Sequence, residues 1–314
     1  MNVIYLLSLK RISFRVDLSF VTPSLRKDFL FYTLFCFAAA VSGTVAPYIS
    51  QLLVSGTMGL AWAGVYAIAL AISSIIEIPY RSLGAISRPH VSEAMSNNDI
   101  AKANFLCKNV ALHQLLVGSF LFFAIWVNID LLFELLPNGE DYVAGKWVVF
   151  ILGLSKLLNS VLNIGTTVLS YSKYYYLSLG FTLLLTFLVI FLNVKLIPLI
   201  GIEGSALSTL MSYLVYYLLL LWVVNRKTKV NPFSTKELLV LAIVSVMFAV
   251  NVVWTTFLSP MLESLFYNDI LAHLLDGVIR TLIVLSVGIL VVYKLKVSEQ
   301  VNGIADSFIS RFRR

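Results

Sequence analysis

The residues best suited to chemistry lie in one apolar stretch, residues 144–171, which reads AGKWVVFILGLSKLLNSVLNIGTTVLSY. At 3.6 residues per turn, its central polar side chains fall within an arc of about 100° on one helix face. These residues are Lys156, Asn159, Ser160, Asn163, Thr167 and Ser170. An ammonium group in mid-membrane costs about 2.5 kcal/mol or more on insertion scales, so it faces protein or a water-filled cavity. The pattern predicts a polar face that lines a path through the membrane.

A structural interpretation of the same face stays open. Asn and Ser side chains hydrogen-bond neighbouring membrane helices, and Lys156 can lose its proton, extend toward the interface or pair locally. We favour the pathway interpretation because ionisable groups within a membrane are functional by default. The two interpretations differ in whether Lys156 contacts a transported molecule.

The composition is that of a polytopic membrane protein. Of the 314 residues, 59% are hydrophobic and 12% are charged, with a mean hydropathy of +0.90. A soluble domain has about a quarter charged residues. The net charge of +7 does not indicate a nucleic-acid partner, because the basic residues are dispersed between apolar segments rather than clustered on one face.

Cysteine and histidine patterns indicate no special chemistry. The two cysteines, Cys36 and Cys107, and three scattered histidines predict neither a disulfide framework nor a metal site, and we expect no cofactor. At the N-terminus an apolar run precedes the charges, which is the reverse of the order in a signal peptide, so no cleaved signal is expected.

Apolar windows of about 20 residues predict an all-α bundle of eight transmembrane helices. The predicted spans are near residues 29–54, 58–80, 108–133, 144–170, 174–196, 202–224, 236–257 and 272–295. Residues 1–27 are predicted to form a cytoplasmic or interfacial linker, and residues 28–314 the transmembrane domain.

The distribution of Lys and Arg predicts the sidedness of these spans. Nineteen of the 23 basic residues fall in segments that the alternation places on one side, which is cytoplasmic by the positive-inside rule. Only Lys146 and Lys195 fall in the opposite loops, alongside several acids. Both termini are therefore expected in the cytoplasm, and the chain is expected to be a multi-pass protein of the plasma (inner) membrane.

Two pairs of opposite charges are spaced i,i+4 on predicted helices, Glu77 with Arg81 and Asp276 with Arg280. Glu77 and Arg81 can form an ion pair at the cytoplasmic interface. Alternatively, Arg81 meets an anionic head group that enters from the cytoplasm. After residue 84 the chain becomes too polar to span, and Asn98 or Asp99 is expected to cap the next helix.

The predicted outer loop LPNGEDYVAG, residues 136–145, contains a Pro-Asn-Gly turn signal. Its Glu140 and Asp141 could bind a cation, although a solvated loop is the preferred interpretation.

Four runs, in order, resemble the C-terminal portion of lipid-linked oligosaccharide flippases. They are GLAWAGVYAIALAISSIIEIPYRSLGAISRPHVSEA at 59–94, IWVNIDLLFELLPNGEDYVAGKWVVFILGLSKLLN at 125–159, SYSKYYYLSLGF at 170–181 and GIEGSALSTLMSY at 201–213. These flippases form the polysaccharide-biosynthesis branch of the multidrug/oligosaccharidyl-lipid/polysaccharide exporter superfamily.

The resemblance implies two six-helix lobes around a cavity that opens alternately to either face. The eight spans match the second lobe plus two trailing helices, so transport is expected to need a first lobe, from an upstream continuation or from another chain. The implied function is translocation of an isoprenoid-pyrophosphate-linked oligosaccharide among membrane lipids, without enzymatic chemistry. The implied substrate site comprises Lys156 and Arg81 for head-group charge, Asn159, Ser160, Asn163 and Thr167 for sugar hydroxyls, and Glu77.

The chain departs from the family pattern at two acids. Members of this group often carry an acid where this sequence has Ser50 and Asn159. Lys156 is retained, but the acidic residues that would accompany it in the family are expected to be absent.

Two other functions compete with transport. A membrane oligosaccharide polymerase or acyltransferase needs a positioned base, a metal-binding group or a set of arginines in a sizeable loop, and the predicted loops are short. A non-transporting remnant is the third interpretation, because one lobe is missing.

The basic-residue distribution makes a topology prediction. Reporters fused after Gly139 and Asn268 should read outside, and reporters fused after Asn97 and Asn231 should read inside. Paired phosphatase and fluorescent-protein fusions would measure this, and an inside signal at Gly139 would overturn the topology.

Overall fold

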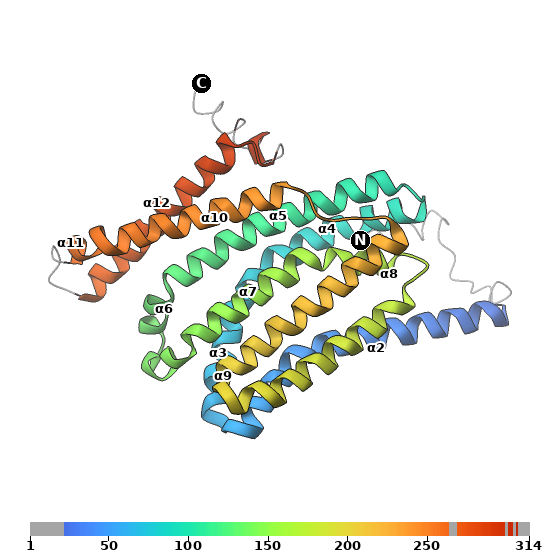
Figure 1. Ribbon diagram of the computed structural model, residues 1–314, viewed down its shortest axis with the longest axis horizontal. Coiled ribbons are helices and arrows are strands. Elements are labelled where there is room, and N and C mark those ends of the chain that lie inside the picture. Colours follow the sequence, from blue (N-terminus) through green and yellow to red (C-terminus); the bar gives the residue numbers. More distant parts are fainter. Residues whose placement is uncertain (1–21, 264–268, 299–300, 304–305, 307–314) are drawn as a thin grey trace, which may run out of the picture.

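The computed structural model describes residues 22–263, 269–298, 301–303 and 306, and every regular element in these ranges is helical (Figure 1). The α-helices are α2 (Pro23–Met58), α3 (Leu60–Ser74), α4 (Ile78–Ser96), α5 (Ile100–Val127), α6 (Ile129–Leu135), α7 (Lys146–Leu162), α8 (Ile164–Ser170), α9 (Tyr176–Thr228), α10 (Lys236–Val253), α11 (Ser259–Glu263) and α12 (Asp269–Lys294). Three short irregular helices complete the set, η2 (Ile75–Glu77), η3 (Gly139–Gly145) and η4 (Trp254–Leu258). The predicted all-α class is confirmed.

The chain is a multi-pass integral membrane protein. Six helices of the described chain are long and apolar enough to cross a membrane. One of them, α9, contains 53 residues and covers both the fifth and sixth predicted spans. The 36-residue α2, which covers the first predicted span, is not among the six. The number eight therefore stays a prediction.

A break in the middle divides α9 into two arms. Ile200 and Gly201 have non-helical backbone angles, and Gly201 has φ +65°, a conformation that side chains other than that of glycine rarely adopt. Pro198 comes just before the break. The two arms lie side by side in Figure 1, so the chain reverses direction here.

Helix α2 begins at Pro23, within the stretch that was predicted to be a linker up to Lys27. The Thr22 hydroxyl accepts a hydrogen bond from the Leu25 amide at 3.3 Å, and proline occupies the first turn, where its missing N–H has no cost. The rest of the predicted linker, residues 1–21, lies outside the described residues.

The second predicted span continues further than hydropathy indicated. Helices α3, η2 and α4 follow one another from Leu60 to Ser96 with only the short η2 turn between them. The next helix, α5, starts where expected, because the Asp99 carboxylate accepts a hydrogen bond from the Lys102 amide at 2.9 Å.

Helix α7 lies at the centre of the bundle and packs against α3, α5 and α9 (Figure 1). Helix α2 covers α9 and α3 on one side, and α10 packs with α5 and α12 on the other. Small residues allow the close approach of α7 to α5. A methyl group built on Gly153 would lie 2.9 Å from the Phe122 ring.

Connections that the sequence assigns to one side of the membrane meet at one end of the bundle. Near the start of α5, the Asn104 side chain donates to the Lys229 carbonyl at 3.2 Å and accepts from the Asn231 amide at 2.7 Å. At the other end, Gly201 approaches Met58, and Lys146 pairs with Asp130 at 2.6 Å.

A neutral polar cluster joins α2 to both arms of α9. Asn193 donates to the Ser50 hydroxyl at 3.1 Å and accepts from Ser205 at 2.6 Å, while Ser50 and Thr209 share a hydrogen bond of 3.1 Å. The Tyr66 hydroxyl of α3 adjoins the same group. All five side chains are buried. Ser50 therefore serves as a hydrogen-bond partner between helices.

The predicted pair of Asp276 and Arg280 is confirmed at 3.6 Å. The Arg280 guanidinium also donates to the Val127 carbonyl at the end of α5, and Asp276 accepts from the Trp254 indole at 2.8 Å. A cation at the carboxyl end of a helix satisfies free carbonyls and interacts favourably with the helix dipole. The pair thus fastens α12 to α5 and to η4.

The packing at Gly153 generates a stability prediction. Gly153→Ala should lower the free energy of unfolding by about 1–3 kcal/mol, because the added methyl group overlaps the Phe122 ring and crowds Ile76. Gly180→Ala is the matched control, since its added methyl group meets no atom within 4 Å. Thermal unfolding of the two variants in detergent measures the difference, and equal melting temperatures would contradict the packing.

Candidate functional site

A buried ion pair lies between α7 and η2. The Lys156 ammonium is 3.3 Å from Oε2 of Glu77, and each side chain is only 9% exposed. Two opposite charges that are buried together avoid most of the penalty that either would meet alone in a low-dielectric interior. The lysine at the centre of the predicted polar face therefore has a carboxylate partner from another span.

Asn159 completes the coordination of the Glu77 carboxylate. Its side-chain amide donates to Oε1 of Glu77 at 2.6 Å, so both carboxylate oxygens have partners. Its carbonyl oxygen accepts from the hydroxyl of Tyr217 on α9 and from the amide of Asn163 at 3.4 Å. A continuous network of five side chains thus links η2, α7 and α9.

Local backbone structure places Glu77 at this position. The chain tightens into the η2 turn at Ile75–Glu77, and Pro79, which has no N–H to donate, lies in the first turn of α4. A 3₁₀ turn rotates about 20° more per residue than an α-helix. The face that carries Glu77 is therefore not the continuous α-helical face that the sequence spacing assumed.

Two sequence-based expectations are corrected here. Lys156 was expected to lack acidic company, but Glu77 supplies it across the bundle. Glu77 was expected to be able to pair with Arg81, but its carboxylate is buried against Lys156 and Asn159, while Arg81 is exposed. The interior pair prevails because an unpaired buried ammonium costs more than a solvated guanidinium.

The structure brings together only part of the predicted polar face. Lys156, Asn159 and Asn163 join Glu77 in the network. The Ser160 hydroxyl instead donates to the Leu157 carbonyl of its own helix at 2.8 Å and is buried. Thr167 is half-buried on α8, one turn beyond Asn163, which follows the last residue of α7.

Sequence reasoning missed the aromatic side of the network. On α9, Tyr217 stacks with Tyr213 at 6.0 Å and meets Tyr216 edge-on at 4.7 Å between ring centroids. The sequence spacing could have indicated this aromatic group, because tyrosines three and four residues apart share one helix face.

Arg88 was also missed. Its guanidinium donates to the Tyr80 hydroxyl at 3.1 Å and lies 5.8 Å from the centroid of that ring. It rests over Gly84, where an added methyl group would lie only 3.3 Å from the guanidinium. Within the described chain no carboxylate lies within salt-bridge distance of Arg88. The sequence could have indicated this contact, because residues spaced at every fourth position, here Tyr80, Gly84 and Arg88, share one helix face.

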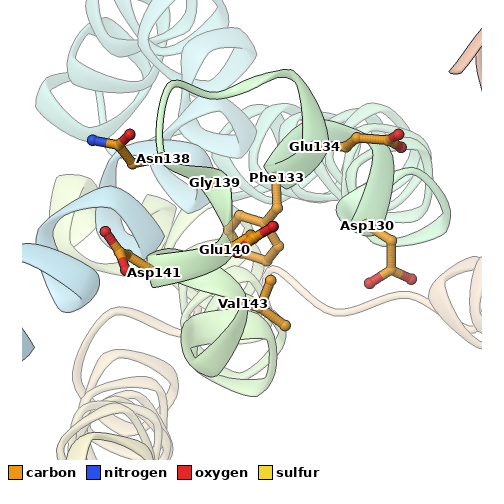
Figure 2. Close-up of a pocket in the computed structure, with 8 residues that line it drawn as sticks. All are labelled: Asp130, Phe133, Glu134, Asn138, Gly139, Glu140, Asp141 and Val143. Carbon is orange, nitrogen blue, oxygen red and sulfur yellow. The ribbon is translucent and has the colours of Figure 1, made fainter.

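A cavity of about 600 Å³ lies at the other end of the bundle, around α6 and η3 (Figure 2). Its lining includes the predicted outer-loop acids Glu140 and Asp141, together with Asp130 and Glu134. The side chains of Asp130 and Asp141 point in different directions. Among the described residues no group of three or more His, Cys, Asp or Glu side chains could hold a metal ion.

No model of a known protein family and no curated protein sequence matches the chain. The Vibrio cholerae MATE transporter VcmN in the bent form aligns over 91% of this chain and 70% of that chain, with a TM-score of 0.55 and 16% identity. The chain has the fold of a MATE transporter.

Two further solved structures score below 0.5 and add nothing to the MATE fold assignment. They are an outward-facing multidrug resistance MATE transporter of the MOP superfamily (88% and 70% coverage, 19% identity, TM-score 0.48) and a MOP superfamily transporter from Pyrococcus furiosus (89% and 70%, 19%, 0.45).

The buried pair generates a second stability prediction. Lys156→Met should lower the free energy of unfolding by about 3–5 kcal/mol, because it leaves the Glu77 carboxylate buried without a cation. Adding Glu77→Gln to this variant should restore most of the loss. Lys195→Met, at an exposed lysine, is the control and should change stability by about 0.5 kcal/mol or less. Denaturant unfolding followed by circular dichroism measures all three, and a wild-type midpoint for Lys156→Met would contradict the pairing.

Proposed function

We propose that this chain contributes to a membrane transporter that moves an isoprenoid-pyrophosphate-linked oligosaccharide from the cytoplasmic to the outer leaflet. The observation that carries the proposal is the Glu77, Lys156, Asn159 and Tyr217 network, which places charged and polar groups inside a MATE fold. Both ionisable residues lie within helices long and apolar enough to cross a membrane, and ionisable groups there characteristically mark a transport path.

The charge balance of the network suits a neutral, hydroxyl-rich ligand. Glu77 and Lys156 cancel each other, and Asn159, Asn163 and Tyr217 add neutral donors and acceptors around them. Sugar hydroxyls both donate and accept hydrogen bonds, so they can replace partners within such a network without leaving a charge unpaired. We assign the oligosaccharide to this part of the site.

The head group needs a different residue. Because Lys156 is already neutralised by Glu77, it has little net attraction for a pyrophosphate. Arg88 is held in place by Tyr80 and Gly84 and has no carboxylate partner in the described chain. Guanidinium groups bind phosphate oxygens through two parallel hydrogen bonds. We therefore assign the pyrophosphate to Arg88, with Arg81, which is exposed like Arg88, as the competing candidate from the sequence.

Alternating access requires walls on both sides of the path. We propose that further helices, on this chain or on a partner chain, complete the cavity. The isoprenoid tail stays in the bilayer, and the complete assembly works in the plasma membrane.

Paired arginine variants test the function and the assignment together. The purified chain in detergent should bind farnesyl pyrophosphate, and Arg88→Gln should weaken this binding at least tenfold, about the value of a charged hydrogen bond. Arg81→Gln makes the same change seven residues away and should leave the affinity within twofold. Isothermal titration calorimetry measures both, with farnesol as the uncharged control ligand.

Translocation is measured separately. Proteoliposomes that contain the complete assembly should move a fluorescent isoprenoid-pyrophosphate oligosaccharide to the opposite leaflet, and Arg88→Gln should slow this movement. Binding without movement in the wild type would favour a non-transporting remnant. Covalent change of the lipid-linked sugar would favour the polymerase or acyltransferase alternative.

A further inference from the structure

A pair of lysines converges on one aromatic ring where α8 passes into α9. The ammonium groups of Lys173 and Lys227 lie 5.3 Å and 5.5 Å from the centroid of the Tyr174 ring. The two charges are therefore within about 11 Å of each other, although they are more than fifty residues apart in sequence. Cation–π attraction holds both lysine side chains at the ring.

The loop that carries Tyr174 is ordered by its own hydrogen bonds. The Ser172 hydroxyl donates to the Leu169 carbonyl at 2.8 Å, which ties the loop to the last turn of α8. The same hydroxyl accepts from the Tyr174 amide at 3.1 Å. The backbone at Tyr174 is thus ordered, and its side chain packs partly buried against the core, which lowers the entropic cost of binding beside the ring.

The positive charge of this pair is not compensated within the described part of the chain. Neither Lys173 nor Lys227 makes a salt bridge there, whereas Lys102 at the same end pairs with Glu93 at 3.5 Å. Arg226 adds a third cation next to Lys227, and its guanidinium lies 5.2 Å from the centroid of the Trp222 ring. Two cations within about 11 Å of each other, with no acid paired to them in the described chain, attract an anion to this part of the surface.

Trp222 locates this cluster relative to the membrane. Its side chain is 59% exposed on the last two turns of α9, one turn before Arg226. Exposed tryptophan residues at the ends of membrane helices lie at the level of the lipid head groups. The basic-residue distribution predicts that this end of the bundle is cytoplasmic, and anionic lipids enrich that leaflet.

We propose that Lys173, Tyr174 and Lys227 form a binding site for the phosphate of an anionic phospholipid in the cytoplasmic leaflet. The phosphate lies beside the Tyr174 ring, where both ammonium groups attract it, and the acyl chains follow the apolar surface of α9 beside Trp222. This site is separate from the network around Glu77 and does not depend on what the protein transports.

Lipid selectivity of the purified chain tests the site. Native mass spectrometry from mixed micelles should show phosphatidylglycerol retained in preference to phosphatidylcholine. Lys173→Gln with Lys227→Gln should reduce that preference by about fivefold for each lysine removed, because a lysine near an anionic lipid contributes about that factor. Tyr174→Leu should lose part of the preference, while Tyr174→Phe keeps the ring and should retain it.

A charge-matched double variant provides the control. Lys195→Gln with Lys236→Gln also removes two exposed lysines and should leave the preference unchanged. An equal loss in this control would overturn the site, since it would show a general effect of net charge. Equal retention of the two lipids by the wild type would overturn it as well.

A soluble ligand distinguishes a lipid from a free anion. Phosphatidylglycerol should raise the melting temperature of the wild type above its value in phosphatidylcholine, and the Lys173 and Lys227 double variant should lose this increment. Glycerol 1-phosphate at the same concentration should give no increment. An equal increment with glycerol 1-phosphate would overturn the assignment to a membrane lipid.

Discussion

The low dielectric of the membrane interior forces Lys156 to have a partner, and much of the bundle follows from that constraint. Its ammonium lies 3.3 Å from the Glu77 carboxylate, and this pairing requires α7 and η2 to adjoin. Asn159 then satisfies the second carboxylate oxygen and draws Tyr217 of α9 into the same network. The central position of α7 is thus an electrostatic requirement as well as a matter of packing.

Hydropathy predicted the all-helical class because it depends on the bilayer, which acts on every span in the same way. The helical class, the cap at Asp99 and the pair of Asp276 and Arg280 follow from local spacing, and all three are present. The partner of Lys156 could not be predicted in this way. Glu77 is 79 residues away in sequence, and only the packing of α3, η2 and α7 brings it close.

Spacing along one helix also misjudged which side chains face the same way. The η2 turn interrupts α-helical periodicity at Glu77, whereas Asn163, between α7 and α8, keeps right-handed helical backbone angles. The Ser160 hydroxyl donates to a carbonyl of its own helix. Tyr217, which was absent from the predicted site, donates to Asn159 from another helix. Arg88 shows that the spacing rule itself holds, because Tyr80 and Gly84 lie beneath it at four-residue intervals.

The neutral cluster around Asn193 has a consequence for the order in which the helices assemble. Ser205 is only 12 residues away, on the returning arm of α9, whereas Ser50 is 143 residues away on α2. An amide exposed to lipid without a partner is costly. The α9 hairpin can enter the bilayer with the Asn193 carbonyl already bonded to Ser205. Helix α2 then docks against the hairpin, and its Ser50 hydroxyl accepts the hydrogen bond that the Asn193 amide still has to donate. Biogenesis is thereby divided into a local insertion step and a later, sequence-distant recognition step within the membrane.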